Sequence, residues 1–433
     1  MTNKNNHAVN FDLLGGKLID PKSGLNKKVD IYIRKGKIYH SSPEEKHSYP
    51  VYNIDGQVVL PGLLDLRAHN RIPGASKSEN IESLTNAAAK GGFSAILLMP
   101  DTKPHCDNPA TIRFIQDRVK QTSKIRVYLS GCLTVGSRGE SIAPLGSLKD
   151  VGVVVVTDCP ATTVNNEILT NAIKYAKMFG LVVFDFPQDA YLSRNSHAHE
   201  SALSLKMGLV GNPRLAEEIA VQRAILISRH LGSRIHLSSL SSSGSVELVR
   251  KAKESGIEIS ADVSAHHLLL TESQILNYNT SAKVNPPLRQ KEDQDALLEG
   301  IKNGVIDGCN SSHEPFADHL KEVEYDIAPA GAIGLETAAL TFIEALRDND
   351  PYELVVEKMC YNPHKILGIS VPSLQENSEA NFVVIKPGAS WVYDPKKGES
   401  LSHNSPLSNY KFSNKISMTL SEGKIAYLCK SVS

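Results

Sequence analysis

One stretch of the sequence decides the fold, Val58-Val59-Leu60-Pro61-Gly62-Leu63-Leu64-Asp65-Leu66-Arg67-Ala68-His69-Asn70-Arg71. Its apolar run gives way to four charged or titratable side chains at alternate positions. Because side chains two apart in a strand share a face, these four are predicted to line one side of an extended segment. They are Asp65, Arg67, His69 and Arg71. In an eight-stranded α/β barrel, the carboxyl end of such a strand is where the chemistry takes place.

Strand-like and helix-like segments alternate through the middle of the chain, which favours a parallel sheet. Helical patterns such as Ile81 to Lys90 and Leu215 to Leu231 lie between most of the strands. Eight strands with intervening helices fit a (β/α)8 barrel of the TIM type, and the same alternation also permits a doubly wound open sheet. The eight predicted strands are 58–66, 93–99, 125–132, 151–157, 181–186, 234–238, 257–264 and 304–310.

Short strands separated by turns occupy both ends of the chain. Near the start, Val29-Asp30-Ile31-Tyr32-Ile33 alternates and is followed by a turn at Lys35-Gly36-Lys37. Near the end, Asn381-Phe382-Val383-Val384-Ile385 has the same character. We therefore predict one small β-sandwich domain built from both termini. The predicted boundaries are 1–57 and 367–433 for the two parts of this domain and 58–366 for the barrel.

The composition excludes several classes of protein. The 433 residues carry 47 basic and 47 acidic side chains, so no excess of positive charge favours a nucleic acid partner. The six cysteines are scattered without paired spacing, which favours a reducing compartment. No apolar run approaches the length of a membrane span, and residues 1–7 lack the apolar core of a signal peptide. A cytoplasmic protein without membrane contact is expected.

The opening stretch resembles that of the dihydroorotases, in the cyclic amidohydrolase group, whose pattern is P-G-x-x-D-x-H-x-H-x-R. Pro61-Gly62, Asp65, His69 and Arg71 match this pattern. Three later motifs extend the resemblance over nearly the whole chain. They are Lys283-Val284-Asn285-Pro286-Pro287-Leu288-Arg289, Gly334-Leu335-Glu336-Thr337 and Asn404-Ser405-Pro406-Leu407. The resemblance implies an amidohydrolase-type barrel with the terminal β-domain.

The family uses one or two zinc ions, and most of the implied ligand positions are changed in this sequence. His69 and Asp158 remain, with Cys159 beside Asp158. Catalytic zinc ordinarily has three protein ligands and a water, so we expect neither zinc nor another cofactor. Arg67 adds to this expectation, because its permanent charge would repel a cation. The positions at which the implied residue is lost are Arg67, Phe186 and Ser239 for histidines and Ser312 for the catalytic aspartate.

By the resemblance, some positions that face the substrate in the family are retained, and one is changed. Asp101 stands in Met99-Pro100-Asp101-Thr102, where the family has an asparagine that helps to hold the substrate. An aspartate there would repel an anionic ligand. The substrate-binding candidates are Arg71, Asp101, Asn285 and His313.

The sequence also leaves two alternative metal sites possible. One is the pair His197 and His199, which stand at alternate positions in a polar stretch that also fits a solvated loop. The other is an unusual site made from the remaining candidate ligands of the barrel. These are His69, Asp158, Cys159 and His313.

The leading hypothesis is a dihydroorotase-like pseudoenzyme of pyrimidine biosynthesis that acts as a structural or regulatory partner. In some organisms inactive relatives accompany aspartate transcarbamoylase, so the resemblance implies that partner, and a homodimer is expected from base rates. The alternative is an active metal-dependent cyclic amidohydrolase that interconverts carbamoyl-aspartate and dihydroorotate at an unusual metal site. A third hypothesis is a small-ligand sensor with an anion pocket near Arg67 and Arg71.

Overall fold

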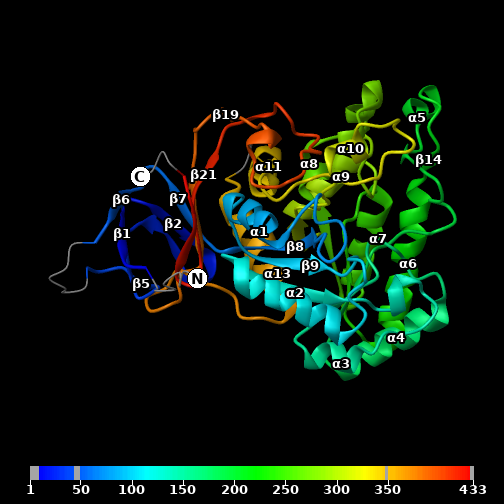
Figure 1. Cartoon of the computed structure of the whole chain (residues 1–433), viewed down its shortest axis with the longest axis horizontal. Coiled ribbons are helices and arrows are strands. Elements are labelled where there is room, and N and C mark those ends of the chain that lie inside the picture. Colours follow the sequence, from blue (N-terminus) through cyan, green and yellow to red (C-terminus); the bar gives the residue numbers. More distant parts are fainter. Residues whose placement is uncertain (1–8, 43–48, 347–349, 430–433) are drawn as a thin grey trace.

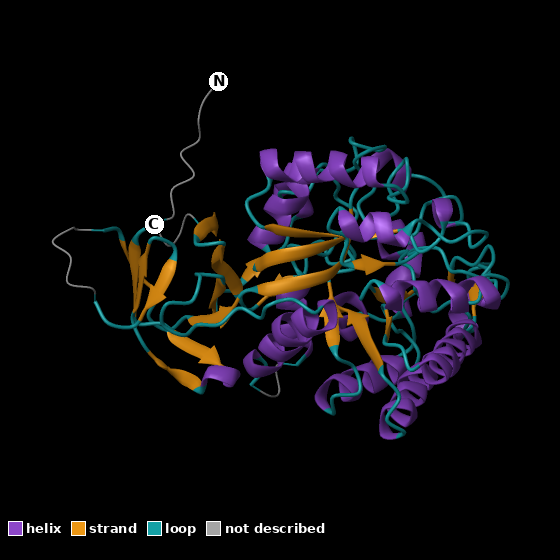
Figure 2. Ribbon diagram, turned by 90° about the horizontal axis from the view of Figure 1, so that it is seen from below, coloured by secondary structure: helices purple, strands orange, loops and turns teal. Residues whose placement is uncertain are grey.

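The computed structural model describes residues 9–42, 49–346 and 350–429. The stretch 1–7, whose polarity argued against a signal peptide, lies outside these residues. A body made of strands lies beside a larger body in which helices surround strands (Figures 1 and 2). Among the described residues, no helix is both long and apolar enough to cross a membrane.

The larger body is the predicted barrel of eight parallel strands. The strands follow the order β17-β16-β15-β12-β11-β10-β9-β8. Between the last strand and the first, the His69 N–H donates to the carbonyl of His313 at 2.8 Å, which closes the barrel. The bounds are β8 (Leu63–His69), β9 (Phe93–Met99), β10 (Arg126–Gly131), β11 (Val155–Val156), β12 (Val182–Asp185), β15 (Ile235–Leu237), β16 (Ile259–Ser264) and β17 (Gly308–Asn310).

Helices cover the outside of the barrel (Figure 2). The predicted helix Ile81 to Lys90 has these bounds in the structure, and its amide groups are capped by the Asn80 side chain. The larger helices are α1 (Ile81–Lys90), α2 (Pro109–Thr122), α4 (Asn166–Met178), α6 (Arg214–Leu231), α7 (Ser243–Glu254), α9 (Lys291–Lys302) and α11 (Ala338–Ala345). Shorter ones are α3 (Leu145–Asp150), α5 (Ala202–Lys206), α8 (Ala265–Leu269), α10 (Asp318–Lys321), α12 (Tyr352–Val356) and α13 (Asn362–Leu367).

The smaller body is a sandwich of two sheets, and one of these sheets takes strands from both termini as predicted. Apolar side chains such as Phe11, Ile33 and Phe382 are fully or almost fully buried between the sheets. One sheet has the order β5-β4-β1-β6, from Lys37–Tyr39, Ile31–Arg34, Phe11–Leu14 and Val51–Asn53. The other has the order β22-β21-β18-β7-β2-β3, from Lys424–Leu428, Lys415–Ser421, Phe382–Lys386, Val58–Pro61, Lys17–Asp20 and Leu25–Lys28.

The single strand predicted at 58–66 is two strands. Val58–Pro61 pairs with β18 in the sandwich, and Leu63–His69 belongs to the barrel. Gly62 joins them, and its N–H donates to the carbonyl of Asn381 at 2.9 Å. A Cβ at Gly62 would overlap the Ser94 side chain, so the two bodies meet at a glycine for steric reasons. The domain boundaries at 57/58 and 366/367 stay a prediction.

Replacing Gly91 by alanine tests the seam between α1 and the segment that follows β17. Gly91 has a negative φ that alanine accepts, but a Cβ would overlap the Leu335 carbonyl oxygen and lie 3.0 Å from the Glu336 Cα. We expect Gly91→Ala to lower the free energy of unfolding by about 2–3 kcal/mol, measured by urea denaturation.

The matched control is Gly256→Ala. Gly256 has a φ of +72°, and a Cβ there meets no described atom within 4 Å. Only backbone strain of about 1 kcal/mol is therefore expected. Equal losses of unfolding free energy in the two variants would show that the close approach of Leu335 to Gly91 does not contribute to stability.

Candidate functional site at the barrel mouth

Arg67 lies at the centre of the barrel mouth with its side chain fully buried. One guanidinium nitrogen donates to the Ser239 hydroxyl at 2.8 Å, and another donates to the carbonyl of Asn285 at 3.2 Å. The guanidinium carbon lies 4.7 Å from the centre of the Phe186 ring, a cation–π distance. Arg67, Phe186 and Ser239, three of the four positions at which the implied residue is lost, are therefore in direct contact.

The ends of the barrel strands around Arg67 are held by a network of polar groups. Asn310 donates to the Ser239 hydroxyl at 3.0 Å and to the Asp262 carboxylate at 2.8 Å. The Ser312 N–H donates to the Asn310 side chain at 2.8 Å. Ser239 and Ser312 have φ angles of +61° and +46°, so both stand in sharp left-handed turns that the network stabilises.

Little space is left beside Phe186 and Ser239, two of the side chains that Arg67 contacts. The hollow that Phe186, Ser239 and Arg289 border has no room for a water molecule. Two large side chains, a guanidinium and a phenyl ring, thus stand where the family is expected to have imidazoles.

A second cluster lies next to Arg67 on the other side of the mouth. His69 Nδ1 lies 2.9 Å from one Asp101 oxygen, and an Arg71 nitrogen lies 3.0 Å from the other. Arg71 also reaches Glu314 at 3.5 Å. Its guanidinium carbon lies 4.7 Å from the centre of the Phe316 ring. Asp101, predicted to face the substrate, is therefore bound between two basic side chains of the protein itself.

The charges of this cluster are coupled. Burial lowers the pKa of His69, but the Asp101 and Glu314 carboxylates raise it by more, to about 10. Burial raises the pKa of Asp101, whereas His69 and Arg71 hold it well below its usual range. Arg67 opposes a proton on His69, since its Nε lies 3.4 Å from His69 Nε2. The two carboxylates outweigh it in the pKa of His69, because one of them touches the ring directly.

Of the remaining sequence candidates, buried Cys159 interacts with His69, whose pKa its thiol helps to raise, and the others do not join this cluster. The Asp158 carboxylate accepts hydrogen bonds from the Thr134 and Thr163 hydroxyls, both at 2.7 Å. His313 is buried, and its Nε2 lies 3.4 Å from a Glu79 oxygen. Asn285 meets Arg67 through its backbone carbonyl. Of the four substrate-binding candidates, the structure brings Arg71 and Asp101 into contact.

His197 and His199, the predicted pair of metal ligands, each contact a different cationic side chain. His197 Nδ1 lies 3.3 Å from the Lys283 ammonium, and His199 Nδ1 lies 3.0 Å from the Arg289 guanidinium. Burial and then Arg289 lower the pKa of His199 to about 4. These contacts favour a structural role for both histidines.

Comparison with known proteins identifies the family. A family model described as dihydro-orotase-like matches residues 56–245, and the amidohydrolase family model matches 197–426. A dihydroorotase of Pelotomaculum thermopropionicum is 39% identical over 91% of this chain and 92% of its own length. The chain belongs to the dihydroorotase family. A dihydroorotase of Syntrophus aciditrophicus is 35% identical over 96% of this chain and 98% of its own length.

Solved structures agree on the fold. An L-hydantoinase from Arthrobacter aurescens superposes with a TM-score of 0.84 over 96% of both chains, at 22% identity. A dihydropyrimidinase from Brevibacillus agri NCHU1002 superposes with a TM-score of 0.82 over 96% of this chain and 95% of its own, at 19% identity. The dihydroorotase-family barrel with its terminal sandwich is thus an amidohydrolase fold.

Amidohydrolases usually bind zinc, and the residues around Arg67 do not fit it. The donors there are the Ser239 hydroxyl and the His69 Nε2, whereas the Phe186 ring offers none. Neutral hydroxyls are poor zinc ligands beside imidazole and thiolate. A guanidinium cation in the same space adds repulsion.

Among the described residues, one cluster of possible metal ligands lies close enough together to hold a single ion. The sequence did not predict this combination. His69, Asp101 and Glu314 each offer an atom within 4.8 Å of the others. The one sequence signal for Glu314 is its place next to His313, and that position does not reveal its partners. The proton on His69 and the Arg71 guanidinium already neutralise the carboxylates of this group. A metal ion must therefore displace both.

Both arginines on which the sensor hypothesis depends are engaged inside the protein. Arg67 donates to Ser239 and Asn285, and Arg71 pairs with Asp101 and Glu314. The structure therefore gives an anionic small ligand no free guanidinium at these two positions.

The charge on His69 predicts a dependence of stability on pH. The ordinary pKa of histidine is 6.5 and the folded pKa is raised to about 10. The pairing thus contributes its full stability below pH 6.5 and loses it as the pH rises through about 10. We expect the difference in free energy of unfolding between the wild type and His69→Gln, measured in urea at several pH values, to shrink over this range.

Subtracting the variant removes the contributions of other groups that titrate in alkali. A difference that stays constant between neutral pH and pH 10 would mean that His69 is neutral in the folded protein. Its contact with Arg67 would then outweigh those with the carboxylates.

Proposed function

We propose that this dihydroorotase-family chain is a non-catalytic member whose barrel mouth is held by Arg67 in place of a metal ion. It would act in pyrimidine biosynthesis as a structural or regulatory partner. The observation that carries the proposal is the buried guanidinium between Ser239, Asn285 and Phe186.

The chemistry supports this proposal. Opening or closing a cyclic amide requires an electrophile for the carbonyl, an activated water and a proton carrier. A guanidinium can stabilise an oxyanion, but it does not lower the pKa of water as zinc does. Ser312 stands at the position of the catalytic aspartate, and a serine hydroxyl is no base near neutral pH. Losing electrophile and base together costs many powers of ten in rate, because such groups act as a unit.

A specific pair of observations favours a second function, an active metal-dependent dihydroorotase. The curated relatives that match this chain over nearly its full length are named dihydroorotase. His69, Asp101 and Glu314 form a group that is able to hold one ion. The names of the relatives support the enzyme better than the pseudoenzyme, and the contacts of Arg67 support the pseudoenzyme.

Metal content and activity separate the two functions. We expect protein purified without chelators, and then supplied with zinc, to hold substoichiometric metal and not to interconvert dihydroorotate and carbamoyl-aspartate. Restoring the family's residues by Arg67→His, Phe186→His, Ser239→His and Ser312→Asp is expected to introduce stoichiometric zinc binding. Plasma mass spectrometry measures the metal in both proteins.

The opposite result identifies the enzyme. Wild-type protein with one zinc or more per chain, and with turnover that disappears together with the metal in His69→Ala, would establish the second function. The four-residue variant is assessed by its metal content. It therefore tests whether these four positions determine zinc binding, even if catalysis is not restored.

The proposed partner is aspartate transcarbamoylase, with homodimerisation of this chain as the expected assembly. We expect co-expression with the aspartate transcarbamoylase of the same source organism to give one species whose mass, by light scattering, exceeds that of either protein alone. Separate elution at micromolar concentrations would contradict this partner without bearing on the metal site.

A further inference from the structure

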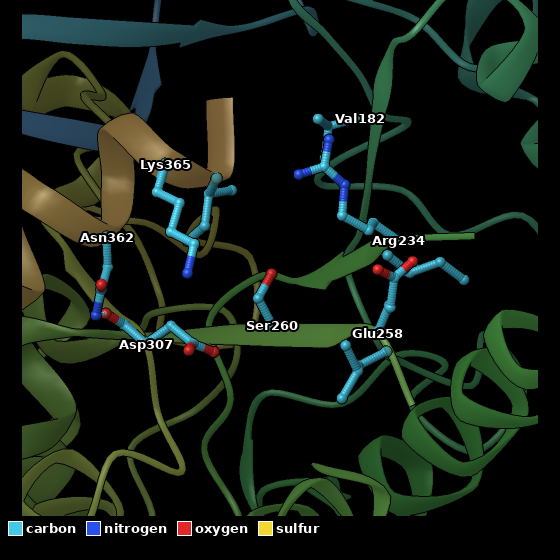
Figure 3. A pocket seen from close by; sticks show the side chains of 10 residues that line it. Val182, Arg234, Glu258, Ser260, Asp307, Asn362 and Lys365 are labelled. Atoms are coloured by element: carbon cyan, nitrogen blue, oxygen red, sulfur yellow. Dashed lines mark hydrogen bonds between the residues drawn. The ribbon is translucent and has the colours of Figure 1, made fainter. Parts of the chain in front are cut away.

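A cavity of about 600 Å³ lies at the rim of the barrel mouth, between loops that follow strands β12, β16 and β17. It has more than twice the volume of the cavity of about 260 Å³ at the floor of the barrel, which charged side chains such as Lys365 and Asp307 line (Figure 3). Helix α5 ends beside the larger cavity, at the edge of the barrel far from the sandwich (Figure 1). Nothing in the proposed function uses this cavity.

Apolar and aromatic side chains form much of the wall of the larger cavity, and hydrogen bonds hold two tyrosines there. Tyr278 Oη donates to the carbonyl of Met207 at 3.0 Å, and Tyr325 Oη donates to the carbonyl of His197 at 3.4 Å. The two tyrosine rings meet edge to face with centroids 6.3 Å apart. The Lys283 ammonium donates to the carbonyl of Tyr325 at 2.7 Å. The shape of the cavity is therefore fixed by contacts within the chain.

The rim of the cavity exposes large apolar side chains to solvent. Leu205, near the end of α5, is 82% exposed, the highest value for a large apolar side chain among the described residues. Tyr278 and Val210, which line the cavity, are 52% and 51% exposed. Tyr278 also has a left-handed φ of +55°, a strained conformation that its bond to Met207 holds in place. Contiguous apolar groups that stay exposed in this way are typical of a protein interface.

The rim also carries charges of opposite sign that do not pair within the chain. Lys206 follows Leu205 at the end of α5, and Glu324 lines the cavity. Both are exposed, and neither side chain has a salt-bridge partner among the described residues. Burial lowers the pKa of Lys283, and the nearby Asp326 carboxylate opposes this effect, so the charge of Asp326 is partly balanced inside the chain. Glu324 is thus the carboxylate of this cavity that can receive a cation from outside.

A projection and a hollow therefore lie side by side on one surface. The projection is Leu205 with Lys206, and the hollow is the cavity with Glu324 in its wall. The two are adjacent, because the residue after Lys206 is Met207, which lines the cavity. A twofold rotation about an axis between them brings each projection to the hollow of the other copy, as an isologous interface requires. An apolar side chain beside a cation matches an apolar hollow beside an anion.

We propose that this surface is the interface between two copies of the chain. Leu205 of each protomer enters the cavity of its partner, and Lys206 pairs with Glu324 of the partner subunit. The proposal rests on the homodimer expected under the proposed function, and it names the surface that forms this dimer. Because the dimer is symmetric, each contact occurs twice and a single substitution removes both.

The first test compares Leu205→Asp with the matched control Met178→Asp. Met178 lies in α4 and is 77% exposed, but it does not line the cavity. We expect the wild type and Met178→Asp to be dimers at micromolar concentrations, by size-exclusion chromatography with light scattering. Leu205→Asp should raise the dissociation constant about 100-fold or more, since it places a carboxylate in each apolar cavity. Its circular dichroism spectrum should match that of the wild type.

A charge-reversal experiment tests the pairing between protomers. Lys206→Glu alone and Glu324→Lys alone should each raise the dissociation constant about 10-fold, because each variant sets like charges opposite one another twice. An equimolar mixture of the two variants should dimerise about as tightly as the wild type. In the mixed dimer both pairs are again of opposite sign, which no contact within one chain can reproduce.

The results that would overturn the proposal also separate it from the proposed function. If Leu205→Asp dimerises as tightly as the wild type, the homodimer stands but another surface forms it. A monomeric wild type would contradict both the interface and the expected homodimer, without bearing on the metal site. Loss of binding to aspartate transcarbamoylase in Leu205→Asp, with a monomeric wild type, would assign the surface to that protein instead.

Discussion

The buried guanidinium of Arg67 organises the mouth of the barrel. A cation in this position requires partners, and it has them from the segments that follow β12 and β15 and from a loop. They are the Phe186 ring, the Ser239 hydroxyl and the Asn285 carbonyl. Ser239 is in turn fixed by Asn310 and Asp262. A metal ion would join the strand ends through its ligands, and here a side chain joins them through hydrogen bonds.

Arg67 in β8 and Arg71, just beyond its end, contact different groups at the mouth. Arg67 donates to the Ser239 hydroxyl and the Asn285 carbonyl, whereas Arg71 faces the carboxylates of Asp101 and Glu314. His69 stands between the two arginines, and the carboxylates on the Arg71 side raise its pKa. This separation explains why an acidic residue is tolerated at position 101, where the resemblance implies an asparagine. Its charge neutralises basic groups of the protein rather than facing a ligand.

Much of the fold was predictable from the sequence, because it follows from local periodicity. The apolar pattern of Ile81 to Lys90 is confirmed. The predicted strand through Asp65, Arg67 and His69 is also present, but a register shift between Asp65 and Ala68 interrupts its regular alternation. The break at Gly62 was not predictable, since Val58 to Leu66 is apolar throughout and only the packing against Ser94 and Asn381 divides it.

The site was predictable residue by residue but not as a set of partners. The sequence indicated that Arg67, Phe186 and Ser239 had replaced ligands, but their mutual contacts depend on the closure of the barrel. Glu314 was overlooked because its role comes from Arg71 and Asp101, which are more than 200 positions away in the chain. Local pattern carries no information on such pairings.

Gly62 also determines how the binding of a partner protein to the sandwich would affect the barrel. The chain passes from β7 of the sandwich to β8 of the barrel through this one residue, and Gly62 itself is hydrogen-bonded to Asn381. No loop lies between the two bodies to absorb a rotation at this crossing. A protein that displaced the sandwich would therefore move the backbone that carries Arg67, and binding at the periphery would change the shape of the mouth.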